Sequence, residues 1–182
     1  MSREKVPLKI VVPIIVVTWV LSVVSSFAIV LGVPSLLVTR HEHNNGWHVS
    51  WRSVDSQRWN TLDQWSTGEL GTSQFPPTFS YAWRWYVFHN YQDWTGFVAT
   101  MQIEVRGDDP ITFTIGSDDG ARLFIDDELQ IDNWRVGGYQ KISKSIQLSR
   151  GFHTLRLEWF DWKEWAIVSF QCDSDILTWT KP

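Results

Sequence analysis

The chain has 182 residues, a net charge of −4 and 13 tryptophans. This length allows one ordinary domain, or one membrane anchor and a smaller domain. From Arg40 onward, 19 acidic residues stand against 13 basic ones, so the basic face that a nucleic-acid partner requires is not expected. The single cysteine, Cys172, excludes an intrachain disulfide, a cysteine-based zinc site and a CxxC redox pair.

Residues 10–39 contain no charged side chain and predict a transmembrane helix. A helix of this length rises about 45 Å, which exceeds the roughly 30 Å of a hydrocarbon core, so we place its embedded part at 14–31. The preceding residues 1–9 carry three basic side chains and one acidic one. By the positive-inside rule, they form a short cytoplasmic N-terminus and the rest of the chain is extracytoplasmic.

A cleaved signal peptide is the alternative for this segment, because Ser-Ser-Phe-Ala at 25–28 is compatible with a small-residue cleavage site. The apolar run is about twice as long as a usual signal core, which favours a retained anchor. The polar residues 40–46 then form a juxtamembrane linker, and 47–182 form the extracytoplasmic domain.

Short β-type runs separated by turn residues follow the linker, and no long window has a helical period. The fold class predicted is all-β, an antiparallel sandwich or partly closed barrel. The expected strands cover residues 47–51, 81–88, 97–105, 111–115, 121–125, 142–148, 152–159 and 166–170.

Two of these strands alternate clearly between apolar and polar residues. Ile111, Phe113 and Ile115 share one face, and so do Leu155, Leu157 and Trp159, with Arg156 and Glu158 on the opposite face. Such alternation indicates one buried face and one solvated face. Residues 53–78 lack it, and we expect a long loop or irregular arm there.

Four blocks of sequence together resemble the PA14 domain family. They are Ser-Asp-Asp-Gly at 117–120, Arg-Leu-Phe-Ile-Asp at 122–126, Ile-Asp-Asn-Trp at 131–134, and the Gly-Phe-His strand at 151–160 that ends in Trp-Phe. Thr-Gly-Phe at 95–97 is also similar to the family pattern. The resemblance covers residues 81–171 and implies a β-sandwich used in adhesins, toxins and glycosidases as a carbohydrate-binding or assembly module.

The resemblance also implies a candidate site at Asp118 and Asp119. In the yeast adhesin branch this pair binds calcium, which in turn holds sugar hydroxyls. The adhesins add an asparagine from a later loop, which here is Asp-Trp-Lys-Glu-Trp at 161–165. Asp161 or Glu164 would have to replace it, while Lys163 would oppose the ion. The alternative is that the aspartates only bond their own backbone and close a hairpin.

Trp162 and Trp165 are further candidates for the carbohydrate site, since both follow a strand whose buried face already contains Trp159. A flat indole can stack on a sugar ring or anchor a protein interface. The third possibility is that both rings fold back onto the edge of the sandwich. Asp126, Asn133 and Trp134 are interpreted as scaffold.

The sequence contains no Gly-x-Ser-x-Gly, phosphate-loop or His-Glu-x-x-His motif, so we do not expect an enzyme. Two hypotheses remain. The first is a membrane-anchored, cell-surface module that binds carbohydrate, with calcium held by Asp118, Asp119 and Asp161. The second is an accessory subunit of a membrane complex or cell-surface assembly with no ligand of its own.

Overall fold

The computed structural model describes residues 46–173 and 177–179, and its regular elements are strands. In chain order they are β1 (Trp47–Val54), β2 (Ser66–Phe75), β3 (Phe79–Trp83), β4 (Thr95–Val105), β5 (Ile111–Asp118), β6 (Gly120–Ile125), β7 (Glu128–Asn133), β8 (Gln140–Ile146), β9 (Gly151–Asp161), β10 (Ala166–Asp173) and β11 (Leu177–Trp179). Among these residues no helix has the length and hydrophobicity needed to cross a bilayer. The helix predicted over residues 10–39, its N-terminal segment and most of the linker lie outside them.

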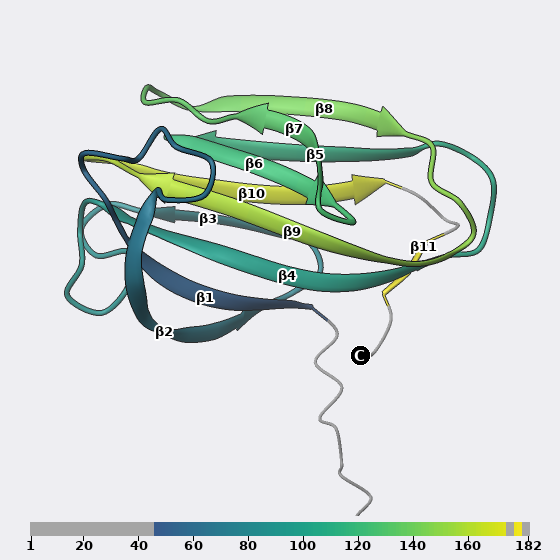
Figure 1. Ribbon diagram of the computed structural model, residues 1–182, viewed down its shortest axis with the longest axis horizontal. Coiled ribbons are helices and arrows are strands. Elements are labelled where there is room, and N and C mark those ends of the chain that lie inside the picture. The colour runs from purple at the N-terminus through teal and green to yellow at the C-terminus, as the bar shows by residue number, and fades with distance from the viewer. Residues whose placement is uncertain (1–45, 174–176, 180–182) are drawn as a thin grey trace, which may run out of the picture. The chain divides into compact units, whose positions relative to one another are not determined.

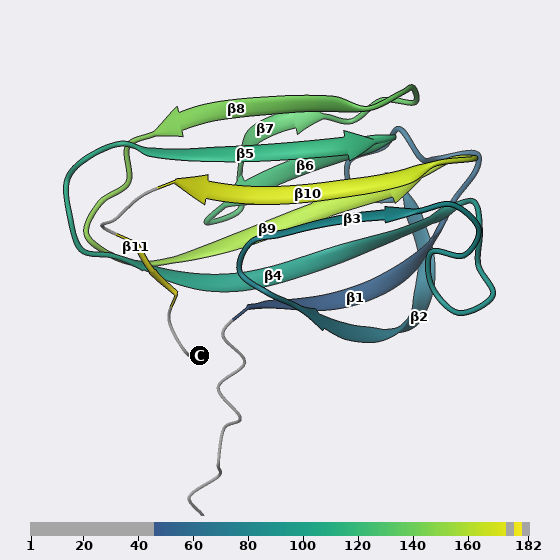
Figure 2. The same cartoon turned by 180° about the vertical axis from the view of Figure 1, so that it is seen from behind.

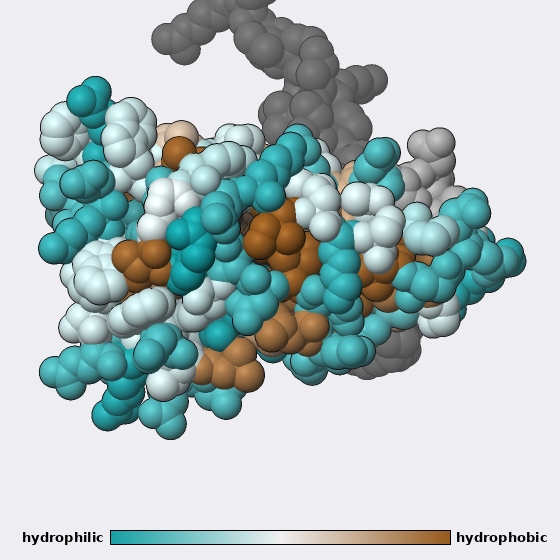
Figure 3. All heavy atoms as spheres, turned by 90° about the horizontal axis from the view of Figure 1, so that it is seen from above, coloured by the Kyte–Doolittle hydropathy of each residue, from teal (hydrophilic) through white to brown (hydrophobic). Residues whose placement is uncertain are grey.

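The strands form two antiparallel sheets that face each other (Figures 1 and 2). The larger sheet has the order β2-β1-β4-β9-β6-β7, with β11 also pairing with β4, and the smaller has the order β3-β10-β5-β8. Figure 3 views the molecule from above Figure 1, where β8 lies, and that face is mostly hydrophilic. The two antiparallel sheets confirm the predicted all-β fold.

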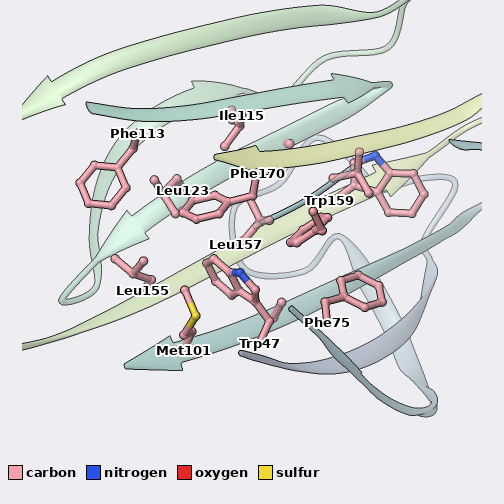
Figure 4. Close-up of a cluster of buried hydrophobic side chains, with 14 of the residues drawn as sticks. Trp47, Phe75, Met101, Phe113, Ile115, Leu123, Leu155, Leu157, Trp159 and Phe170 are labelled. Carbon is pink, nitrogen blue, oxygen red and sulfur yellow. The ribbon is translucent and has the colours of Figure 1, made fainter. Parts of the chain in front are cut away.

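The core lies between the two sheets and follows the alternation of the strands. Leu155, Leu157 and Trp159 of β9 are fully buried and meet Phe113 and Phe170 of the smaller sheet (Figure 4). Burying each such side chain contributes about 1.5–3 kcal/mol. The Trp159 indole N–H is satisfied as well, because it donates to the carbonyl of Ile167 at 3.1 Å. Local periodicity thus predicted the inward faces correctly.

The outward face of β9 differs from the prediction, because Glu158 is buried and not solvated. Residues 55–65 of the β1–β2 connection, called the arm below, reach this face. The guanidinium of Arg122 bonds Glu158 at 2.9 Å and the Leu62 carbonyl of the arm at 2.8 Å. A second hydrophobic cluster lies on the same side of β9 around Trp65 and Phe160.

The expectation of a loop over residues 53–78 was wrong in its second half, where β2 pairs with β1. Most residues of β2 are polar and half are exposed, because it is an edge strand with a partner on one side only. Edge strands need little hydrophobic alternation, so periodicity did not reveal it.

The predicted strand over residues 81–88 ends early, and two short strands were not predicted. β3 stops at Trp83 because its partner β10 begins at Ala166, directly opposite, so the ladder has no further partner. The mostly polar β7 and the three-residue β11 each have only two alternating apolar residues, too few to stand out as a strand.

Candidate functional site

The chain crosses from one sheet to the other at Asp118 and Asp119, which are joined by a cis peptide bond. Asp118 ends β5 in the smaller sheet, whereas Gly120 begins β6 in the larger one. The two aspartates therefore do not close a hairpin between paired strands. A Cβ at Gly120 would lie 2.1 Å from the ring of Phe160, so this close passage requires glycine.

The carboxylate of Asp119 connects two loops that are distant in sequence. Its Oδ1 accepts a hydrogen bond from the backbone N–H of Gly137 at 2.7 Å, and its Oδ2 accepts one from that of Trp162 at 2.6 Å. Gly137 lies in the β7–β8 loop and Trp162 in the β9–β10 turn. Asp119 thus organises loops contributed by both sheets, and it does not form the local turn that was the alternative prediction.

Asp161, the last residue of β9, is fully buried. Neither of its carboxylate oxygens has a hydrogen-bond partner among the described residues. Burial, together with the charges of Asp119, Asp93 and Asp118, raises the pKa of Asp161 to about 8. Such a group requires either a proton or a cation, because a buried carboxylate without a partner is costly.

A pocket of about 430 Å³ is lined by Asp118 and Asp119, whereas the buried Asp161 is not part of its lining. Its lining includes Asp118, Gly137 and Trp165, from three different connections. Partial burial and the neighbouring charge of Asp119 raise the pKa of Asp118, although Arg135 acts in the opposite direction. The β5–β6 step, the β7–β8 loop and the β9–β10 turn all lie at the left end of the sandwich in Figure 1.

The two candidate tryptophans are in different environments. Trp165 is 50 % exposed at the pocket, where a planar ligand can reach its ring. Trp162 also lines the pocket, but its ring packs between Trp59 of the arm and Trp94, with centroid distances of 5.7 and 4.9 Å. Of the three sequence-based alternatives, folding back therefore describes Trp162. The exposed ring of Trp165 fits the other two, stacking on a sugar and anchoring a protein interface.

The β7–β8 loop and the arm are parts of the site region that sequence reasoning missed. Val136 and Gly137 of the β7–β8 loop line the pocket. The indole of Trp134 donates to the Trp59 carbonyl at 2.6 Å and so holds the arm beside the site. A Gly-Gly pair and scattered tryptophans gave no local signal that these segments would meet Asp119.

Asp118, Asp119 and Asp161 fit calcium in ligand type. Calcium takes six to eight oxygen ligands from carboxylates, carbonyls and water. The two buried oxygens of Asp161 have no partner within the described part of the chain, and the charges of both other carboxylates act on them. Within residues 46–173, however, no three acidic, histidine or cysteine side chains are grouped as a ready-made metal site. Backbone carbonyls and water would have to complete the coordination.

The model of the PA14 domain family matches residues 54–182. The chain belongs to the PA14 domain family. The predicted membership is confirmed, and the matched part extends well beyond the residues 81–171 that carried the resemblance. β1 lies almost entirely before the match, yet it is a central strand of the larger sheet in this PA14 domain.

Solved structures with a similar fold come from proteins of different kinds. An anti-sigma factor domain-containing protein from Clostridium clariflavum is 22% identical, with a TM-score of 0.56, and the match covers 75% of this chain and 45% of that one. The PA14 domain of the antifreeze protein MpAFP is 14% identical, with a TM-score of 0.52 and coverage of 74% and 82%. At these identities the similarity establishes a shared fold.

A β-glucosidase from Kluyveromyces marxianus, solved in complex with glucose, is also 14% identical with a TM-score of 0.52. The match covers 72% of this chain but only 17% of the glucosidase. This PA14 domain thus spans less than half of the anti-sigma factor protein and a small part of the glucosidase. A comparison with curated protein sequences gave no match.

Proposed function

We propose that this PA14 domain is a carbohydrate-binding module whose site is the pocket at Asp118, Asp119 and Trp165, with calcium as its cofactor. The observation that carries the proposal is Asp161, a fully buried carboxylate without a partner among the described residues, close to two further aspartates. The charges of Asp119 and Asp118 act on Asp161 and disfavour its ionised form, and a cation bound near them would relieve this repulsion. Calcium would supply that charge and would have open coordination positions for sugar hydroxyls.

The lining of the pocket suits a saccharide. The half-exposed ring of Trp165 offers a flat apolar surface, while Asp118 and Glu164 offer hydrogen-bond acceptors. Sugar rings combine an apolar face with polar edges, so a site that binds them needs both kinds of group. Trp162 contributes to this site through its backbone N–H, which donates a hydrogen bond to the Asp119 carboxylate.

The proposal describes binding without catalysis. The glucosidase is matched over 17% of its length, so this similarity gives no indication of hydrolytic activity here. Anchoring of the module in the cell membrane by residues 10–39, with the PA14 domain on the extracytoplasmic side, is part of the proposal and rests on the sequence alone.

The first test is calorimetric titration of the full-length protein with calcium. We expect saturable binding by the wild type and at least tenfold weaker binding by the Asp118→Asn, Asp161→Asn double variant. The control is Asp108→Asn, Asp109→Asn, which also neutralises two aspartates but in the exposed β4–β5 loop. Equal binding by all three proteins would refute a calcium site at the pocket.

The second test is a glycan array probed with the full-length protein, with calcium and with a chelator. The proposal requires a defined set of glycans bound with calcium, and loss of this binding in the double variant. An array that stays blank under both conditions would refute carbohydrate binding and favour the accessory-subunit hypothesis.

A further inference from the structure

A second pocket of about 240 Å³ lies next to the first. Its lining includes Arg84, Trp85, Gln92 and Asp93 of the β3–β4 connection. Lys163 and Glu164 of the β9–β10 turn line both pockets. The two pockets therefore share one wall, and a ligand longer than the first can reach the second across it.

Two indole rings lie in a row along this wall, with one guanidinium group between them. The guanidinium carbon of Arg84 lies 5.3 Å from the ring centroid of Trp165 and also 5.3 Å from that of Trp85. Trp165 lines the first pocket and Trp85 the second. The row thus leads from one pocket to the other, with an exposed indole at each end.

The groups in this row have unused binding capacity. Trp85 is 67% exposed, although burying an indole ring is strongly favourable. Arg84 holds its position through its two ring contacts and makes no hydrogen bond or ion pair with the described part of the chain. Its guanidinium has five N–H donors in one plane. A planar set of donors beside an exposed indole matches the hydroxyl-bearing edge and apolar face of one sugar ring.

The second pocket is polar, which favours a saccharide over an apolar protein segment. Arg84, Gln92, Asp93, Lys163 and Glu164 supply donors and acceptors of both charges. A hydrophobic anchor would have to cover these groups without satisfying their hydrogen bonds, and this is costly. The hydroxyls of a sugar both donate and accept, so they can satisfy such a mixed set.

We propose that the ligand is an oligosaccharide: one unit occupies the first pocket, and a neighbouring unit stacks on Trp85 in the second pocket and accepts hydrogen bonds from Arg84. This inference rests on the proposed carbohydrate binding and adds the ligand's length. Two adjoining pockets, each with one exposed indole, suit a ligand of repeating units, because a single sugar fills only one of them. Binding energy from the second unit then adds to that of the first.

The test compares matched monosaccharides and oligosaccharides on one glycan array, followed by calorimetry with the best oligosaccharide and its terminal monosaccharide. The wild-type full-length protein should bind the oligosaccharide at least about tenfold more tightly, and Trp85→Ala should weaken that binding by about five- to tenfold, the effect of one stacked ring. Trp85→Ala should leave monosaccharide binding unchanged. Arg84→Gln should also weaken oligosaccharide binding.

Tyr86→Ala is the matched control, because Tyr86 is an adjacent exposed aromatic residue that lines neither pocket. It should bind both ligands as the wild type does. Equal affinity for the two ligands, or Trp85→Ala and Arg84→Gln variants that bind like the wild type, would overturn the second subsite and leave the proposed function standing. Failure of the wild type to bind any saccharide would overturn both.

Discussion

At the scale of single residues, Asp161 is the group with the most unusual environment. Its carboxyl group has no hydrogen-bond donor among the described residues, and the charges of Asp119, Asp93 and Asp118 act on it. The folded protein therefore retains a proton on Asp161 at pH values well above those at which a carboxyl group usually loses it. The neighbouring Asp119 is buried as well, but two backbone N–H groups satisfy it. Hydrogen bonding, and not burial alone, distinguishes the two carboxyl groups.

The raised pKa of Asp161 predicts how stability depends on pH in the absence of cations. In the unfolded chain Asp161 loses its proton near its ordinary pKa of 3.8, whereas in the folded protein it does so near 8. Between these values the folded state binds more protons than the unfolded state, so raising the pH lowers the free energy of unfolding. Above about pH 8 this contribution no longer changes.

Asp161→Asn should remove this slope, since the amide does not titrate. The measurement is urea unfolding from pH 5 to pH 8.5 with a chelator present, and the variant should gain stability relative to the wild type as the pH rises. The control is Asp109→Asn, an exposed aspartate, which should follow the wild type. Parallel curves for wild type and Asp161→Asn would contradict the environment described for this residue.

At the scale of elements, a buried ion pair joins Arg122 of β6 to Glu158 of β9, and the same arginine holds the arm. Arg122 and Glu158 are 3% and 6% exposed at their side chains, and Arg122 also bonds the Leu62 carbonyl and lies 3.9 Å from the Trp134 ring centroid. One cation thus connects β6, β9 and the arm. Its contribution is large only while both partners are present, because a single buried charge is left without compensation when its partner is removed.

Glu158→Ala should therefore lower the free energy of unfolding by about 3–5 kcal/mol. Replacing both partners with apolar residues, as in Arg122→Met with Glu158→Leu, should be less destabilising than the single variant. Denaturant unfolding of both variants, with the exposed Glu128→Ala as control, measures this. A single variant as stable as the control would show that the pair does not hold the arm.

The strands with a full hydrophobic face were predictable, and the segments around the site were predictable only in part. β4, β5 and β9 repeat apolar residues at every second position. This pattern can be recognised locally, because successive side chains of any strand point to opposite faces. β2 carries no such pattern, because its place at an edge is set by β1. Asp118 and Asp119 were found through a family resemblance, whereas Val136 and the arm reach the site through contacts that no local pattern encodes.

At the scale of the whole domain, the site lies where the chain passes between the two sheets. The β5–β6 step connects the smaller sheet to the larger one, and Gly120 passes directly against Phe160 of β9. Positions of the site residues thus depend on the packing of the sandwich itself. A change at this crossing should affect the stability of the domain and the geometry of the pocket together.

Gly120→Ala tests this dependence, because its Cβ would lie 2.1 Å from the Phe160 ring and force one of them to move. We expect a loss of about 1–3 kcal/mol in the free energy of unfolding, as for other overpacked positions. Gly68→Ala in β2 is the control, since no atom lies within 4 Å of its added Cβ. Thermal unfolding of both variants measures the difference, and equal melting temperatures would contradict the described close contact.

The sequence by itself determined that the domain is all-β, which faces of its main strands point inward, and which family it belongs to. These properties follow from the period-2 placement of apolar residues and from four short sequence blocks, each of which is local. Only the tertiary structure decided that Asp161 is buried without a partner among the described residues, that Asp119 bonds two separate loops, and that Trp162 folds back while Trp165 remains exposed. These properties depend on groups that distant segments bring together, and no spacing along the chain encodes such distances.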